Sequence, residues 1–266
     1  MDGHLGSIGA GHMGGAILRA VLDAGLYPPP SVHISSPVPS ELEAFAQCDT
    51  GSDNAAVVNA SGLILLATRP QQVPGVLREI APHMSGKCLL SIAAGVTVSS
   101  IRALLPPDAY VLRVMPNLPL AYGAGAAVLA KPEGVPEGFA GQARAIFECG
   151  GIVEVLDEDL INASTALGGS AVAYFFRMAA VMRAWGERNG IPADAALNIA
   201  AQTMLGASKM LTGSGKTPGA LAESVAVPGG TTEAAFRAFD ETGFDGALIA
   251  GLDACRDRGI ALYKSC

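Results

Sequence analysis

The chain has 266 residues, of which 50% are apolar and only 15% charged, and its net charge is −7. This length allows one large or two modest domains, and the composition excludes a disordered chain. The acidic balance argues against nucleic acid as a partner. Five scattered cysteines without CxxC spacing and four histidines without ligand spacing predict a reduced, cytoplasmic protein without a metal site.

No signal peptide is expected, because the first residues are acidic and glycine-rich rather than basic and apolar. The most apolar stretch, 160–176, contains asparagine, serine, threonine and glycine residues and is closed by Arg177. It is too polar for a membrane-spanning helix, so we expect no membrane partner. A helix buried in the core or in a subunit interface fits this stretch better.

The first part of the chain alternates between strand and helix patterns. We expect strands at 4–10, 31–36, 62–68, 87–95, 110–116, 123–131 and 151–156, and helices at 12–25, 39–47, 73–84, 98–105 and 139–150. Strands separated by helices predict a mainly parallel sheet.

From residue 160 onward only helix periodicity remains, and Gly190, Gly213 and Gly243 stand where helices are expected to end. The fold class is therefore α/β. An N-terminal Rossmann-type dinucleotide-binding domain (1–157) precedes a C-terminal all-helical dimerisation domain (158–266).

The sequence IGAGHMGGAI places Gly9, Gly11 and Gly14 in GxGxxG spacing between the first strand and the first helix. The first glycine permits a tight turn, the second lets the backbone approach a pyrophosphate, and the third allows close helix–strand packing. The residues expected to contact a dinucleotide here are Gly9, Ala10, Gly11, His12 and Met13. The alternative is a glycine-rich turn without a ligand.

The end of the second strand distinguishes the two nicotinamide cofactors. NAD enzymes commonly place an acid there to bind the ribose, but here Ser35 and Ser36 occupy the position. With no carboxylate to repel a 2′-phosphate, and two hydroxyls to bond it, we expect NADPH to be preferred and NADH to be used less well. The alternative is that the serines cap the next helix.

Several segments together resemble the pyrroline-5-carboxylate reductase family nearly end to end. They are the glycine motif, ATRPQQV, SIAAGV, RVMPNLPLAYGAG and the long segment PGALAESVAVPGGTTEAAFRAFDE. The resemblance implies an NADPH-dependent imine reductase that makes proline, the last step of proline biosynthesis. It also implies a homodimer that can assemble into a larger ring such as a decamer.

Site residues follow from this resemblance by position. It implies cofactor contacts at Asn54, Ala67, Thr68, Arg69, Ala94, Gly95, Met115, Pro116 and Asn117. It implies substrate contacts at Val227, Gly229, Gly230, Thr231 and Thr232. Each has a plainer alternative, such as a turn at Ala94–Gly95 or a solvated charge at Arg69.

The chain also departs from the family pattern at three places. The family has Ser-Gly-Ser-Gly-Pro-Ala-Tyr where this chain has Gly168–Tyr174, a serine at Val227, and a threonine at Leu118. These departures lie near the expected substrate pocket, so they leave the fold unaffected but leave the exact cyclic imine open.

The chemistry of imine reduction agrees with the lack of histidine in the second half of the chain. A ketone needs a committed proton donor, whereas a protonated cyclic imine already carries the charge that attracts hydride. The PGGTT loop offers backbone N–H groups at a helix start for a carboxylate, and Thr232 adds a hydroxyl for the imine nitrogen. From local sequence alone Thr232 fits a helix cap equally well.

Three other functions compete with this one. A related NADPH-dependent reductase would act on a six-membered piperideine carboxylate. A β-hydroxyacid dehydrogenase needs a lysine followed four residues later by asparagine, and here Lys209 is followed by Gly213. A non-catalytic NADP-binding redox sensor leaves the PGGTT segment without a purpose.

Overall fold

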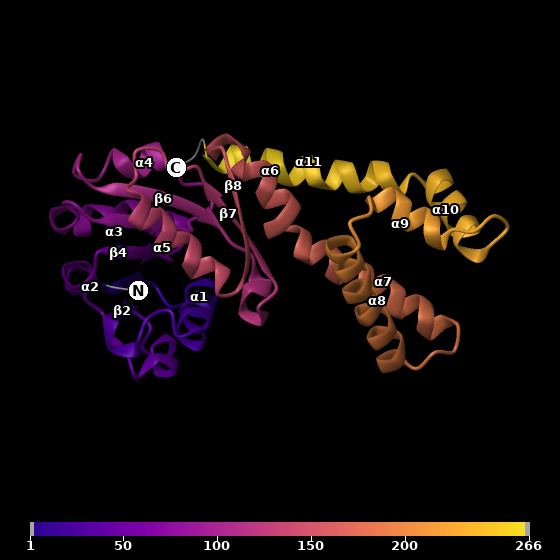
Figure 1. The fold of residues 1–266 in the computed structure, drawn as a ribbon, viewed down its shortest axis with the longest axis horizontal. Helices are drawn as coiled ribbons and strands as arrows, with labels where there is room; N and C mark the ends of the chain where they lie inside the picture. The colour runs from indigo at the N-terminus through magenta and orange to yellow at the C-terminus, as the bar shows by residue number, and fades with distance from the viewer. Residues whose placement is uncertain (1–2, 264–266) are drawn as a thin grey trace. The chain divides into compact units, whose positions relative to one another are not determined.

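The computed structural model describes residues 3–263, and its first part is built on one eight-stranded sheet (Figure 1). The strands lie in the order β3-β2-β1-β4-β5-β6-β7-β8, and all neighbours are parallel except β6 and β7. Their bounds are β1 Leu5–Ile8, β2 Val32–Ser35, β3 Asp49–Gly51, β4 Leu63–Leu66, β5 Cys88–Ser91, β6 Tyr110–Met115, β7 Gly125–Ala130 and β8 Gly151–Leu156. The predicted mainly parallel sheet is confirmed.

Helices cover both faces of the sheet. Against one face pack α1 (His12–Asp23) and α5 (Glu137–Glu148), through Ile17, Leu18 and Phe147 among others. The opposite face carries α2 (Asn54–Ala60), α3 (Val73–Ile80) and α4 (Val98–Arg102). Strands β1, β2, β4 and β5 are buried along their whole length, as expected for parallel strands covered on both faces.

One local prediction in this part is wrong, and two short elements were not predicted. The helix expected at 39–47 is a pair of short 3₁₀ turns, Pro39–Glu41 (η2) and Glu43–Phe45 (η3). Prolines at 37 and 39 restrict the chain before them, and the segment then turns directly into the short edge strand β3, which was not predicted. Helix α2 was not predicted either; its N-cap is Asp53, whose side chain accepts a hydrogen bond from the N–H of Ala56.

The chain divides into two compact units, residues 1–172 with 255–266, and residues 173–254. The predicted domain boundary at Asp157, placed where strand patterns give way to helix periodicity, stays a prediction. In the first unit, η7 (Glu158–Leu160), α6 (Ile161–Ser164) and a π-helical turn, η8 (Thr165–Gly169), lead into α7 (Ala171–Arg188). The last part of α11 (Phe244–Tyr263), from Cys255 on, belongs to the same unit.

The described residues of the second unit form helices joined by loops, without a strand. It contains most of α7, then α8 (Ala193–Gly213), α9 (Pro218–Val225), α10 (Thr231–Thr242) and the first part of α11. Helix α8 ends at Gly213, α10 is capped by Gly243, and α7 ends two residues before Gly190, as predicted. Positive φ values occur at Gly190, Gly215 and Gly243. Helices α7 and α8 pack closely at Gly186, where an added methyl group would lie 2.8 Å from Ala196 Cβ.

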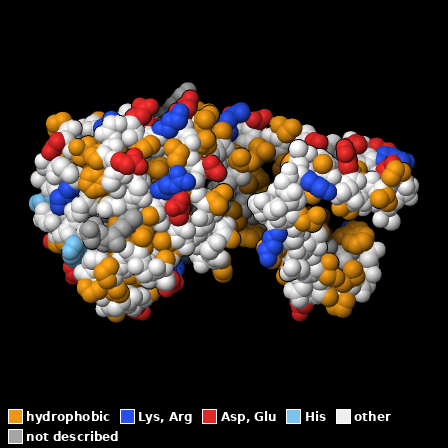
Figure 2. Space-filling view, viewed as in Figure 1, with side chains coloured by type: hydrophobic (Ala, Val, Ile, Leu, Met, Phe, Trp, Pro, Cys, Tyr) orange, Lys and Arg blue, Asp and Glu red, His pale blue; other side chains and the backbone are white. Residues whose placement is uncertain are grey.

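Within the described residues, one helical stretch, 158–188, is long and apolar enough to cross a membrane by length and composition. Only 11% of its most apolar window is buried within the chain. This low burial argues against a core helix and favours the other expectation for the 160–176 segment, a subunit interface. Figure 2 shows apolar side chains on the outer face of the α7–α8 hairpin as well.

Candidate functional site

The carboxyl ends of the parallel strands gather most of the predicted cofactor residues at one edge of the sheet. Gly9 follows β1 with φ +98°, and a methyl group there would lie 2.6 Å from the carbonyl oxygen of Ala67, just after β4. A methyl group on Gly14 would lie 2.7 Å from the carbonyl oxygen of Gly9. Both positions therefore require glycine, and they hold the turn against the crevice between β1 and β4 where the strand order reverses.

The start of α1 is suited to a pyrophosphate. Gly11 is its N-cap and supplies no side-chain hydrogen bond, so the N–H groups of the first turn, at His12 and Met13, face outward from a 12-residue helix. Near this turn the hydroxyl of Thr68 is buried without a hydrogen-bond partner among the described residues. An orphaned hydroxyl beside an uncapped helix start fits a polar ligand, so the residues present fit a dinucleotide.

Ser35 belongs to a hydrogen-bonded row at the end of β2. Its hydroxyl donates to Asn54 Oδ1 at 2.7 Å, and Asn54 Nδ2 donates to Glu79 Oε2 at 3.0 Å. Asn54 therefore lies at the end of β2, where the resemblance expects the adenosine. Arg69 is exposed beyond β4 and donates its backbone N–H to Gln72 Oε1, beginning the next turn.

Ser36 corrects one sequence inference. Its hydroxyl donates to Glu41 Oε2 at 2.6 Å and accepts from the N–H of Val38 at 3.1 Å. A carboxylate does therefore stand at the end of β2, because the η2 turn folds Glu41 back onto Ser36. The capping alternative also fails, since no side chain caps η2.

A cavity of about 240 Å³ in the first unit brings Ala94, Gly95 and Met115 together. The rest of its wall was not predicted, and consists of Asn162, Thr165, Ser170, Cys255, Arg258 and Gly259. Gly95 has φ +77°, so Ala94–Gly95 is a turn that also lines a cavity. The sulfur of Cys255 lies 3.2 Å from the Ser170 hydroxyl oxygen across this wall. No local sequence signal marks these late residues, because only the return of the chain through α11 places them here.

Pro116 and Asn117 lie buried at the end of β6, and both the oxygen and the nitrogen of the Asn117 amide bond protein groups. Its oxygen accepts from the N–H of Ala126 at 2.9 Å, and its nitrogen donates to the carbonyl of Gly168 at 3.2 Å. Gly168 belongs to the π-helical turn η8, a conformation often found at functional sites. Asn117 thus fixes the turn that carries Thr165 and Ser170.

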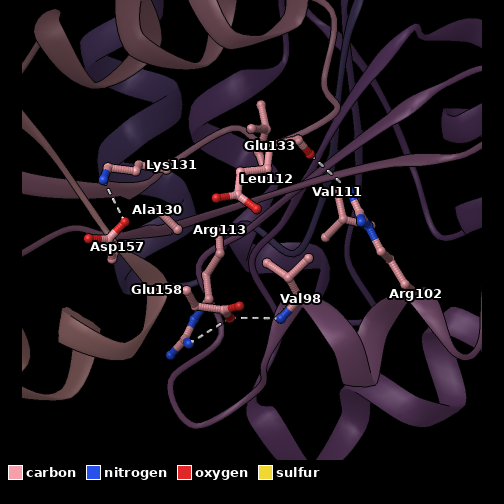
Figure 3. Close-up of a pocket in the computed structure, with 10 residues that line it drawn as sticks. All are labelled: Val98, Arg102, Val111, Leu112, Arg113, Ala130, Lys131, Glu133, Asp157 and Glu158. Carbon is pink, nitrogen blue, oxygen red and sulfur yellow. Dashed lines mark hydrogen bonds and ion pairs between the residues drawn. The ribbon is translucent and has the colours of Figure 1, made fainter.

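A second cavity, of about 210 Å³, is lined largely by charged side chains and by none of the predicted cofactor residues (Figure 3). Arg113, only 1% exposed, pairs with Glu158 at 3.1 Å, and Glu158 also accepts from the N–H of Val98 at 2.8 Å. Lys131 pairs with Asp157 at 2.6 Å. Because the bridge from Arg113 to Val98 joins β6, η7 and α4, we interpret it as a brace rather than a cofactor site.

In the second unit, the PGGTT loop leads into α10. Gly229 takes φ +74°, and its N–H donates to Glu233 Oε2 at 2.8 Å, while the N–H of Gly230 donates to the carbonyl of Val227 at 2.9 Å. The glycine N–H groups are therefore occupied, contrary to expectation. In this loop and the first turn, no described residue accepts from the N–H groups of Thr231 and Thr232.

The cap alternative for Thr232 is excluded by the same helix start. Gly230 is the N-cap of α10, and Thr232 is the second helical residue, with no side-chain hydrogen bond to the first turn. The half-buried residue Thr232 and the exposed Val227 side chain remain proposals as substrate contacts.

Comparison with known proteins agrees with both halves of this arrangement. Residues 4–95 match the model of the family described as NADP oxidoreductase coenzyme F420-dependent, and residues 158–262 match that described as pyrroline-5-carboxylate reductase dimerisation. Pyrroline-5-carboxylate reductase 3 of Mus musculus is 36% identical, over 98% of this chain and 96% of that protein.

Two solved structures share the whole fold. A pyrroline-5-carboxylate reductase from Coxiella burnetii is 28% identical with a TM-score of 0.92, over 98% of this chain and 99% of the other. Plasmodium falciparum pyrroline carboxylate reductase with NADP bound is 22% identical with a TM-score of 0.90, over 98% of each chain. With full-length identity above 30% to a named relative, the chain belongs to the pyrroline-5-carboxylate reductase family.

Proposed function

We propose that the protein reduces 1-pyrroline-5-carboxylate to L-proline with NADPH, the last step of proline biosynthesis. The observation that carries this is the uncapped glycine turn of α1 beside the orphaned Thr68 hydroxyl, in a chain whose relatives are pyrroline-5-carboxylate reductases. The substrate is a small molecule, and NADPH, when bound, supplies the hydride.

The remaining chemistry falls to residues of this chain. The glycine turn and the strand ends hold and orient the dinucleotide, and the cavity beside Gly95 and Met115 receives its reactive end. The N–H groups of Thr231 and Thr232 receive the substrate carboxylate, and the Thr232 hydroxyl bonds the ring nitrogen. No strong acid is required, because the imine is reduced in its protonated form and yields an amine.

The direct test is NADPH consumption by the purified protein with pyrroline-5-carboxylate, with proline identified as the product. NADPH binding without turnover on any cyclic imine would leave the redox-sensor alternative and reject an enzyme. If a six-membered piperideine carboxylate is turned over faster than pyrroline-5-carboxylate, the six-membered imine is the substrate instead. That alternative is motivated by Gly168, which departs from the family pattern and whose carbonyl is held by Asn117.

The protein is an oligomer of identical chains, and we propose a cytoplasmic homodimer as its smallest unit, with a ring such as a decamer as a further assembly. In the helical unit only Ala196 and Ala200 count as buried core among the described residues. Large side chains remain exposed, including Phe176 at 67%, Val181 at 64% and Trp185 at 57%. Apolar surface of this extent supports a partner chain.

A further inference from the structure

We propose that Glu41 sets the balance between NADPH and NADH, as a specificity-determining residue that opposes the 2′-phosphate. The inference rests on the proposed function, and it deepens it. It is drawn from the position of the carboxylate rather than from the sequence around β2, in which no acid follows the strand directly.

The first observation is where the carboxylate lies. One oxygen, Oε2, accepts from the hydroxyl of Ser36 at 2.6 Å, immediately after β2. The other, Oε1, would lie 3.3 Å from a methyl group built on Gly11, so it stands directly over the second glycine of the turn. In dinucleotide-binding folds this space, between the glycine turn and the end of the second strand, receives the ribose of the adenosine.

The second observation is that Glu41 and an incoming 2′-phosphate need the same partners. Ser36, 4% exposed, has its one proton donated to Glu41, and its oxygen accepts from Val38. The uncapped start of α1 at Gly11 favours negative charge beside it, and the Glu41 carboxylate already supplies one. Two anions at this position repel each other, so the carboxylate must leave Ser36 before a 2′-phosphate can bond it.

A ribose with a free 2′-hydroxyl faces no such conflict. A carboxylate is the group that accepts from this hydroxyl in NAD-binding folds, and Glu41 can do so from its present position. The segment 35–43 carries no lysine or arginine to offset the charge for NADPH. Glu41 alone therefore lowers the preference for NADPH over NADH.

The test is binding, measured by calorimetry with two fragments that differ only in the phosphate, adenosine 2′,5′-bisphosphate and adenosine 5′-monophosphate. Glu41→Gln keeps the shape of the side chain and removes its charge, and Glu41→Ala removes both charge and shape. In each variant we expect the affinity ratio, bisphosphate over monophosphate, to rise about tenfold, which corresponds to about 1.4 kcal/mol. Glu43→Gln, an exposed acid two residues further on, is the matched control and should leave the ratio unchanged.

The kcat/KM ratio for NADPH over NADH should rise in parallel, and the gain should shrink as salt is added. If Glu41→Gln and Glu41→Ala both fold and keep the wild-type affinity ratio of bisphosphate over monophosphate, the proposed role of Glu41 is wrong. If the wild type reduces the imine normally in that case, the proposed function stands. Wild-type protein that binds neither fragment nor intact NADPH would overturn both.

Discussion

The side-chain amide of Asn117 joins two segments that are 51 positions apart, by donating to the carbonyl of Gly168 while accepting from the N–H of Ala126. Strand β6 is thereby tied to the π-helical turn that lines the cavity beside Met115. Both bonds involve a side chain that is only 8% exposed.

Asn117→Ala should therefore destabilise the fold by about 1–3 kcal/mol, because it leaves the N–H of Ala126 without its acceptor. Thermal or urea unfolding measures this. Asn117→Asp is the matched variant: it keeps the acceptor for Ala126 but sets a carboxylate against the Gly168 carbonyl. It should lower cofactor affinity as well as stability. Wild-type stability in Asn117→Ala would show that the two bonds contribute nothing net.

The brace between Arg113 and Glu158 gives a second prediction. Removing one member of a buried ion pair costs about 3–5 kcal/mol, and because Glu158 is one-third exposed we expect Glu158→Gln to fall at or below the lower limit. Chemical denaturation checks the loss. Glu148→Gln, which breaks the exposed pair with Arg144 on α5, should cost less than about 0.5 kcal/mol. If Glu158→Gln and Glu148→Gln lower the free energy of unfolding equally, the ion pair of Glu158 does not stabilise the fold more than an exposed pair does.

Cysteine reactivity tests the cavity beside Gly95. Burial raises the pKa of Cys88 to about 12, so in the folded protein at pH 8 this thiol stays protonated and should resist alkylation. Cys255 lines the cavity and should be alkylated slowly, and more slowly with NADP⁺ bound. Peptide mapping by mass spectrometry separates it from the other cysteines, including Cys266, which lies outside the described residues.

Adenosine 5′-monophosphate is the control for that experiment. It fills only the adenosine end of the site, so it should leave the labelling rate of Cys255 unchanged. If adenosine 5′-monophosphate slows the alkylation of Cys255 as much as NADP⁺ does, the protection arises at the adenosine end. The cavity would then not be the place where the reactive end of the cofactor binds.

The apolar face of α7 gives the fourth prediction. Phe176→Asp places a charge on a surface that we expect the partner chain to cover, so light scattering should show a shift from the oligomer toward the monomer. Glu187→Gln changes a side chain of the same helix that pairs with Arg183, and should leave the mass unchanged. A wild-type chain that stays monomeric at micromolar concentration would contradict the proposed dimer.

Periodicity and glycine spacing predicted the layers of this fold because both are local signals. The buried strands read as apolar runs, and Gly9 and Gly14 stand where the backbone leaves no room for a side chain. The contact between Glu41 and Ser36 was not predicted because it depends on a 3₁₀ turn that begins at Pro39, in a segment whose sequence pattern indicates a helix. Cys255 and Arg258 reach the cavity only through the tertiary path of α11, which no spacing encodes.

Thr232 is the residue on which the proposed chemistry depends most. The N-cap of α10 is Gly230, so a stabilising cap cannot account for a hydroxyl at the second helical position. A hydrogen bond from this hydroxyl to a partly charged ring nitrogen is worth about 1.5–3 kcal/mol. Thr232→Ala should lower kcat/KM by roughly 10- to 100-fold, since about 1.4 kcal/mol corresponds to a factor of ten.

The same variant should melt within about one degree of the wild type, because no structural bond is lost; a shift that small is about 0.5 kcal/mol or less for a chain of this size. Thr231→Ala is the neighbouring control. Its side chain is exposed and its N–H remains available to the substrate carboxylate, so turnover should change little. Thr232→Ser restores the hydroxyl without the methyl group and should recover most of the activity. A Thr232→Ala protein that reduces the imine at the wild-type rate removes Thr232 from the chemical step, whatever its melting temperature.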